Sequence, residues 1–166
     1  MVAVTNFSMG SFCPYRPQIR ITVPSHSGLA ASWIGFAGPR KLGVFFAAET
    51  GFIVARSPDA VLAPDIGFVR VEKIHSAGIS DKFFALPPDF AVEVLSPGDS
   101  AQTVEVKALK YLDAGTRLVW VVNPRTESVT VYQPGPMTQY LKKTDTITGE
   151  DVLPGFSCAV AEFFTF

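Results

Sequence analysis

The sequence predicts an α/β or α+β domain built around a mixed β-sheet. Its 166 residues are 48% hydrophobic and 17% charged, which suits one compact fold and is too apolar for intrinsic disorder. From Leu42 onward, short β-branched and aromatic runs alternate with Pro, Gly, Asn and Asp, as in strands separated by turns. One strong helical pattern lies between two of these runs. These observations favour a sheet with a helix packed against it.

The first 48 residues differ from the rest of the chain. They contain four basic residues and no acid, whereas the remaining 118 residues carry ten basic and fifteen acidic side chains, a balance of −5. They also hold four Pro, five Gly and five Ser, a composition that disfavours regular helices and strands. We therefore expect residues 1–41 to form an atypical, poorly ordered segment and residues 42–166 to form the domain.

Seven segments have the composition of strands. Every residue from Leu118 to Val122 is apolar, so both faces of this strand should be covered, as in an inner strand of a helix-flanked sheet. The turn-forming residues 123–127 then lead into an alternating run, which predicts a hairpin with an antiparallel outer strand. The predicted strands are Val44–Ala48, Gly51–Arg56, Ile66–Arg70, Phe90–Leu95, Arg117–Val122, Ser128–Gln133 and Thr138–Lys142.

One helix of about four turns is predicted between the strands at 90–95 and 117–122. Asp99 or Ser100 can cap its start, and Gly115 can end it in the left-handed conformation. The two strands and this helix form a β-α-β crossover, which places the helix on one face of the sheet. A short helix is also expected near the C-terminus, over Val160–Phe164. The apolar positions at helical spacing are Ala101, Val104, Ala108, Tyr111 and Leu112.

Glu93 is anomalous because it lies inside an apolar strand. The two-residue period of a strand places Asp89 and Glu93 on the same face. A buried, unpaired carboxylate costs several kcal/mol, so Glu93 needs a cation, a proton or a cavity. Lys107 lies about 60° around the helix from Val104 and can reach over the sheet. Tyr111, one turn later, can hydrogen-bond into the same site.

A second acid, Asp65, precedes another predicted strand. Two carboxylates from different strands are hard oxygen ligands for Mg²⁺ or Mn²⁺, and such an ion lowers the pKa of a bound water. Lys107 would then orient that water or offset phosphate charge. Simpler interpretations exist for each residue: Asp65 can shape a turn, Lys107 can border the helix and Tyr111 can serve packing. Asp89 either supports the metal site or caps the strand entrance.

Five motifs follow one another along the chain. They are Pro64-Asp65, Pro88-Asp89-Phe-Ala-Val-Glu93-Val-Leu-Ser96-Pro97, Lys107-x-x-x-Tyr111-Leu-x-Ala-Gly115, Leu-Val-Trp120-Val-Val-Asn-Pro124 and Gly149-Glu-Asp-Val-Leu-Pro-Gly-Phe156. Together they resemble one known family, the Uma family of putative restriction endonucleases. The resemblance runs from about Leu42 to Phe166, and it is specific because the order and spacing of the motifs agree.

The resemblance implies membership of the PD-(D/E)XK superfamily, the restriction-endonuclease-like fold and Mg²⁺-dependent cleavage of phosphodiester bonds in DNA. Asp65 would be the motif aspartate, Glu93 the motif glutamate and Lys107 the lysine that this family carries on its helix. Leu95 occupies the position where the superfamily usually has lysine. Members usually begin with helices that bear an acidic motif, whereas this chain has no acid before Glu49. The N-terminal helices are therefore expected to be atypical or missing, and residues 1 to about 38 to derive from a frameshifted, truncated or substituted start.

Several other classes of protein are disfavoured. The formal charge of −1 gives no polybasic surface, and Cys13 and Cys158 form neither a disulfide framework nor a zinc motif. No apolar run approaches the roughly 18 residues of a membrane span, and the start lacks a basic secretory signal, so we expect a cytoplasmic protein without a membrane partner. Nucleophile-elbow, P-loop and Gly-x-Gly-x-x-Gly motifs are absent from the sequence.

Three interpretations follow. The first is a metal-dependent DNA endonuclease, with Asp65 and Glu93 as metal ligands and Lys107 assisting the water. The second is a catalytically inactive, truncated nuclease-fold domain that acts as a binding or interaction module. The third is a β-rich module without metal, in which Glu93 faces solvent. Because cleavage of two DNA strands usually requires two active sites, symmetry suggests a homodimer.

Overall fold

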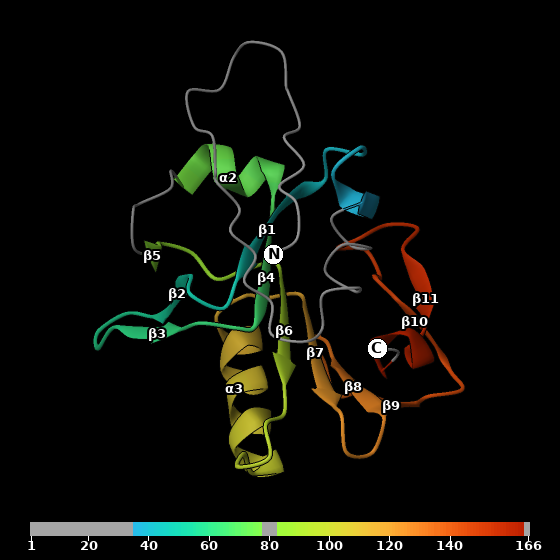
Figure 1. Ribbon diagram of the computed structural model, residues 1–166. Helices are drawn as coiled ribbons and strands as arrows, with labels where there is room; N and C mark the ends of the chain where they lie inside the picture. Colours follow the sequence, from blue (N-terminus) through green and yellow to red (C-terminus); the bar gives the residue numbers. More distant parts are fainter. Residues whose placement is uncertain (1–34, 78–82, 165–166) are drawn as a thin grey trace, which may run out of the picture.

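A six-stranded mixed sheet forms the centre of the computed structural model, which describes residues 35–77 and 83–164 (Figure 1). The strand order is β1-β4-β6-β7-β8-β9. The neighbours β6 and β7 are parallel, and the other neighbouring pairs are antiparallel. The strands are β1 Gly43–Ala47, β4 Ile66–Arg70, β6 Phe90–Val94, β7 Leu118–Asn123, β8 Ser128–Tyr132 and β9 Thr138–Lys142.

Two small sheets and three helices complete the described fold. The second sheet has the order β3-β2-β5, and the third is the pair β10-β11. A short helix follows β4, the long helix connects β6 to β7, and a 3-10 helix follows β11. Their bounds are β2 Gly51–Ala55, β3 Ala60–Leu62, α2 Val71–Ala77, β5 Phe83–Phe84, α3 Ala101–Asp113, β10 Thr146–Thr148, β11 Ser157–Ala159 and η1 Val160–Phe164.

The predicted β-α-β crossover is confirmed. Helix α3 connects the parallel strands β6 and β7. Ser100 caps its start by accepting a hydrogen bond from the backbone N–H of Thr103 at 3.0 Å. Gly115, with φ of 102°, adopts the backbone conformation that other residues rarely tolerate just after the helix. The predicted hairpin is also confirmed, because β7 and β8 pair antiparallel.

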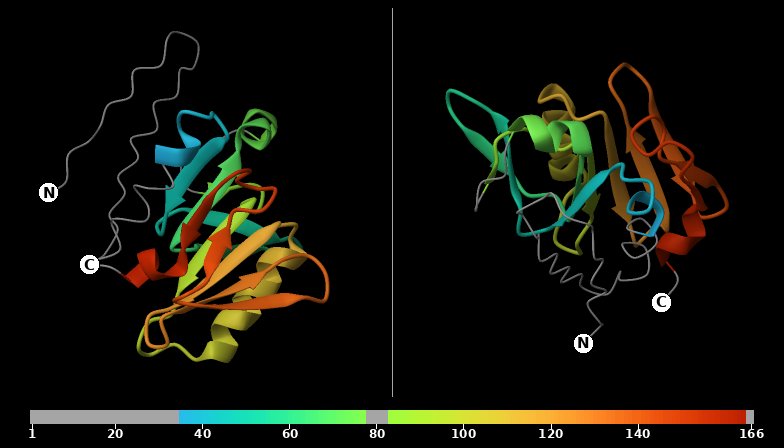
Figure 2. Two further views of the ribbon diagram at one scale, coloured as in Figure 1. Left: turned by 90° about the vertical axis from the view of Figure 1, so that its right-hand side faces the viewer. Right: turned by 90° about the horizontal axis from the view of Figure 1, so that it is seen from above.

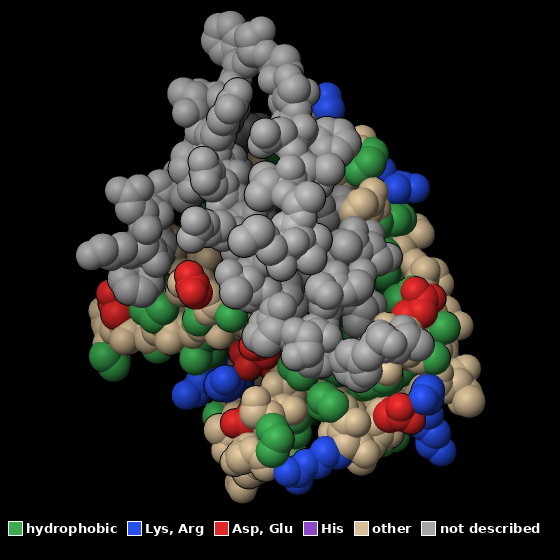
Figure 3. All heavy atoms as spheres, in the orientation of Figure 1, with side chains coloured by type: hydrophobic (Ala, Val, Ile, Leu, Met, Phe, Trp, Pro, Cys, Tyr) green, Lys and Arg blue, Asp and Glu red, His purple; other side chains and the backbone are tan. Residues whose placement is uncertain are grey.

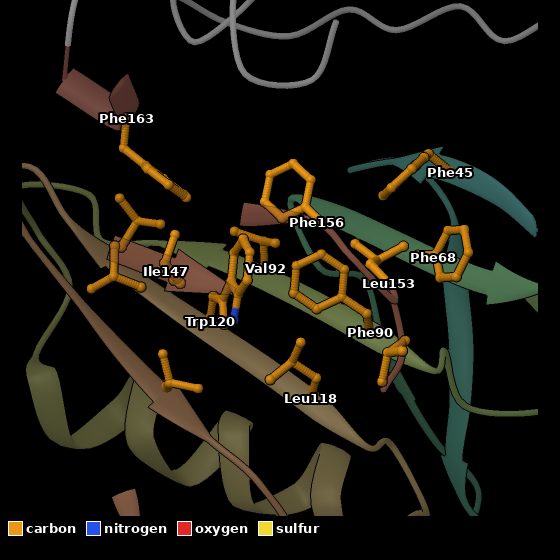
Figure 4. Packing of buried hydrophobic residues seen from close by; sticks show 14 of the residues in the cluster. Phe45, Phe68, Phe90, Val92, Leu118, Trp120, Ile147, Leu153, Phe156 and Phe163 are labelled. Carbon is orange, nitrogen blue, oxygen red and sulfur yellow. The ribbon is translucent and has the colours of Figure 1, made fainter. Parts of the chain in front are cut away.

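Strand β7 is an inner strand with both faces covered, as its apolar sequence predicts. Val119 and Val121 point toward α3 and pack with Val104, Ala108 and Tyr111. The alternate residues Leu118, Trp120 and Val122 point to the other face. There they pack against the C-terminal segment, residues 146–164, which contains β10, β11 and η1 (Figure 4). Helix α3 and this C-terminal segment therefore lie on opposite faces of the sheet (Figure 2). The two-residue period of the strand produces two separate cores.

The domain core includes residues that precede the predicted boundary at Leu42. Residues 35–37 form a helical turn, and Ala37 is buried in the larger core. Phe36 packs edge-to-face against Phe156, with ring centroids 5.3 Å apart. This apolar contact attaches residues 35–37 to the C-terminal segment. The composition of residues 1–41 had predicted poor order here. The rest of the predicted N-terminal segment, residues 1–34, lies outside the described residues.

Several short elements were not predicted from the sequence. They are α2 and the strands β3, β5, β10 and β11. Strands of two or three residues are too short to show an alternating pattern. The backbone N–H of Arg70, just before α2, donates to Asp89, which is 19 residues away, so a contact distant in sequence fixes the chain at the start of this helix. The expected C-terminal helix is present as the 3-10 helix η1. Within the described residues, no helix has the length and hydropathy of a membrane span.

The central position of Trp120 predicts a large loss of stability on truncation. Its side chain is fully buried and contacts Phe90, Phe156 and Phe163. We expect Trp120→Ala to lower the free energy of unfolding by about 3–5 kcal/mol and the Tm by roughly 10 °C. Met137→Ala, at a residue 77% exposed, should change stability by no more than about 0.5 kcal/mol. Equal effects in thermal unfolding would contradict this view of the core.

Candidate active site

Glu93 lies near the carboxyl end of the inner strand β6, on the face that α3 covers. Ala91, two residues earlier on the same face, belongs to the core beneath α3. Phe90 and Val92 point to the opposite core. Only 4% of the Glu93 residue is exposed, so its carboxylate must find its partners within the protein.

Helix α3 supplies two of these partners. The Lys107 ammonium donates to Oε2 of Glu93 at 3.1 Å, and the hydroxyl of Tyr111 donates to Oε1 at 3.1 Å. Lys107 and Tyr111 are four residues apart and so lie on the same side of the helix. The contacts that the sequence predicted for Glu93, Lys107 and Tyr111 are therefore present.

Asp65 lies beside this cluster, at the start of β4. Its Oδ2 accepts a hydrogen bond from the backbone N–H of Val94 at 2.7 Å. This bond holds Asp65 against the residue that follows Glu93. Asp65 is exposed whereas Glu93 is buried, so the pair extends from the sheet interior to the surface.

Burial raises the pKa of the Glu93 carboxyl above its ordinary value of 4.5. Lys107 opposes this effect through its hydrogen bond and its charge, the negative charge of Asp65 raises the pKa, and the hydrogen bond from Tyr111 lowers it. Burial and then the charge of Glu93 also raise the pKa of Tyr111, so its hydroxyl remains a neutral donor. Because burial disfavours the ionised form of Glu93, an added positive charge nearby would stabilise its carboxylate.

Asp89 makes its contacts at the other end of β6. Its carboxylate accepts the backbone N–H of Arg70 at 2.9 Å and lies 3.3 Å from the ammonium of Lys73. Asp89 precedes Glu93 by four positions along the extended chain, a distance of about 13 Å. Of the two roles considered from the sequence, these contacts match the cap at the strand entrance.

The same end of the sheet binds the C-terminal segment, because Arg70 donates to the Asp151 carbonyl at 2.7 Å and Arg117 forms an ion pair with the Asp151 side chain.

The donor set suits Mg²⁺ or Mn²⁺. The described part of the chain contains no group of three or more His, Cys, Asp or Glu side chains that could hold a metal. Mg²⁺ is commonly bound through one or two carboxylates and keeps several of its waters. Asp65 and Glu93 are two carboxylates of this kind at the carboxyl end of β6.

Arg125 is a residue that the sequence analysis did not identify. It lies in the turn between β7 and β8, and its guanidinium donates to the carbonyl of Pro97 at 2.7 Å. Pro97 belongs to the loop that leads from Glu93 to the helix of Lys107. The available signal was topological, because the turn after β7 must lie at the same sheet edge as the end of the parallel strand β6.

The mixed sheet and the crossover helix that joins its two parallel strands place the protein in the nuclease-like fold class. The chain belongs to the Uma2 family, described as putative restriction endonuclease, which matches residues 25–161. The match begins within the stretch that the sequence analysis treated as atypical, upstream of Leu42.

A solved structure supports the same fold. It is described as a putative nuclease belonging to DUF820 from Anabaena variabilis ATCC 29413. The similarity has a TM-score of 0.69 and 22% sequence identity, and covers 84% of this chain and 79% of the other. A search of curated proteins finds no match.

The raised pKa of Glu93 predicts how stability depends on pH. Between pH 4.5 and its raised pKa, the folded protein keeps a proton that the unfolded chain has lost. The contribution of Glu93 to stability is therefore complete below pH 4.5 and is lost as pH rises through the folded pKa. We expect Glu93→Gln to remove this decline, so that its Tm relative to wild type is higher at pH 8 than at pH 4.

Thermal unfolding between pH 4 and pH 8 measures this difference. Glu105→Gln, at an exposed acid of the same helix, serves as the control and should follow the wild-type profile. A Glu93→Gln profile parallel to that of wild type would show that Glu93 has the same pKa in both states.

Proposed function

We propose that this protein is a Mg²⁺-dependent DNA endonuclease that hydrolyses phosphodiester bonds. The observation that carries the proposal is the meeting of Asp65, Glu93 and Lys107 at one sheet edge, although they come from three different elements. Two carboxylates and one ammonium group suit hydrolysis of a phosphodiester, because the site must hold a divalent cation and offset phosphate charge. Membership of the Uma2 family supports this choice of reaction.

Each residue has a distinct role in the proposal. Asp65 and Glu93 would hold Mg²⁺ or Mn²⁺, and such an ion would supply Lewis-acid chemistry and lower the pKa of a bound water. Tyr111 positions the Glu93 carboxylate by donating to Oε1. The Lys107 ammonium contacts Oε2 and would orient the attacking water or offset the negative charge of the phosphate.

One observation favours a second function, that of a catalytically inactive binding module. Glu93 already has its charge offset by Lys107 and its second oxygen bound by Tyr111, as in a structural ion pair. In that case Asp65 and Glu93 would bind no divalent cation.

The endonuclease proposal also predicts DNA as the partner, a homodimer in solution and the cytoplasm as the compartment. Light scattering of the purified protein tests the homodimer.

Loss of the Glu93 carboxylate should remove metal binding and cleavage together. We expect Glu93→Ala to abolish Mn²⁺ and Mg²⁺ binding in calorimetric titration and to lower plasmid cleavage at least about 100-fold. Asp89→Asn, at the other end of β6, should retain metal binding. Circular dichroism would verify that both variants are folded. A folded wild-type protein that binds neither ion would favour the inactive module.

Removal of the Lys107 charge should separate metal affinity from activity. At pH 8 we expect Lys107→Met to bind Mg²⁺ roughly five-fold more tightly, because the ammonium no longer repels the cation. The same variant should cleave DNA about 100-fold more slowly, because the water and phosphate lose that group. Calorimetry and plasmid cleavage measure the two effects. Weaker Mg²⁺ binding by the variant would contradict the proposed competition between Lys107 and the metal.

A further inference from the structure

The turn between β7 and β8 places an arginine at the same sheet edge as the candidate active site. Glu93 on β6 is the register partner of Val121 on β7. Pro97 and Arg125 each follow four residues after these partners, and the Arg125 guanidinium donates to the Pro97 carbonyl at 2.7 Å. Figure 3, in the orientation of Figure 1, shows Lys and Arg side chains along the lower edge of the molecule, where β6 and β7 end.

The acids near this turn already have partners. Glu127, in the same turn, forms an ion pair with Lys143 at 2.7 Å. The Asp99 carboxylate, in the Pro97 loop, accepts the backbone N–H of Ser96 at 2.9 Å. Among the described residues, Arg125 makes no ion pair with a carboxylate, and its side chain lies at an exposed position. Its positive charge is therefore available to an anion from solvent.

The bond to Pro97 prepares Arg125 to bind such an anion. A guanidinium has five N–H donors in a rigid, planar fork that matches the oxygens of a phosphate. One donor holds the side chain on the Pro97 carbonyl. This anchor reduces the rotamer entropy that a long side chain loses on binding.

The distance from the active site suits a contact within the same DNA strand. Four residues beyond Glu93 correspond to at most about 13 Å of extended chain. Successive nucleotides rise about 3.4 Å along the axis of B-DNA, so this reach spans no more than about four nucleotide steps. A cation at this place can hold a phosphate near the one that is cleaved.

We propose that Arg125 binds a backbone phosphate of the DNA substrate and thereby positions the neighbouring phosphodiester at Asp65, Glu93 and Lys107. This inference rests on the proposed function, because it assigns the substrate contact of that same site. The contact is to phosphate and carries no sequence preference of its own. Its signature is therefore a change in the salt dependence of binding.

The experiment measures binding of a fluorescein-labelled 30-base-pair duplex at 50–200 mM NaCl, with EDTA present so that cleavage does not interfere. Arg125→Gln is the central variant, because it keeps a polar N–H donor but carries no charge. Arg125→Lys keeps the charge. Arg117→Ala removes an arginine at the opposite end of β7 and is the matched control. Thermal unfolding of each variant verifies the fold.

We expect Arg125→Gln to bind roughly ten-fold more weakly at 50 mM salt and to reduce the slope of log K against log salt by about 0.9. Arg125→Lys should keep most of the slope, and Arg117→Ala should match wild type. Wild-type behaviour of Arg125→Gln would overturn the inference and leave the proposed function intact. A wild-type protein that does not bind the duplex would also overturn the inference, and plasmid cleavage with Mg²⁺ then shows separately whether the proposed function fails.

Discussion

The burial of one carboxylate constrains the rest of this structure. Glu93 lies inside an apolar strand between two hydrophobic cores, where an unpaired charge would be strongly unfavourable. Lys107 and Tyr111 make that burial tolerable, and both depend on how α3 lies across the sheet. The position of the helix and the charge at the site are therefore linked. A change that moves α3 alters the packing of the core and the ionisation of Glu93 at the same time.

The two faces of the central sheet differ in what they bury: one packs only hydrophobic side chains, and the other also holds the charged Glu93. Trp120 and its aromatic neighbours fill one core, whose buried members are all hydrophobic. The other core, under α3, contains Ala91 and Ala108, small side chains that allow the helix to approach the sheet where Glu93 emerges. Hydrophobic burial on the first face thus provides stability, and the second face accepts a charged group at its margin. Because β6 and β7 are parallel, the loops after both strands gather at the edge where that charge lies.

Much of the fold and of the candidate site could be predicted from local patterns. The strand period and the helix period together predicted that Lys107 and Tyr111 meet Glu93. The period of a strand assigns a residue to a face but not to a position along it, so it grouped Asp89 with Glu93 although Asp89 binds Arg70 and Lys73. Helix α2 and the contact between Arg125 and Pro97 depend on partners distant in sequence. Patterns within a short window contain no information about such pairs.

Asp151 joins Arg70 and Arg117 at the amino end of β6 and β7, the edge opposite the candidate site. These polar contacts attach the C-terminal segment to two strands of the central sheet. At the carboxyl edge, the hydrogen bonds of Asp65 with Val94 and of Arg125 with Pro97 join loops and strands of the central sheet instead. The central sheet and the C-terminal segment therefore stay joined at the amino edge even when the loops of the carboxyl edge change in length or sequence. One scaffold can in this way vary its loop surfaces around the charged groups at the carboxyl ends of β6 and β7.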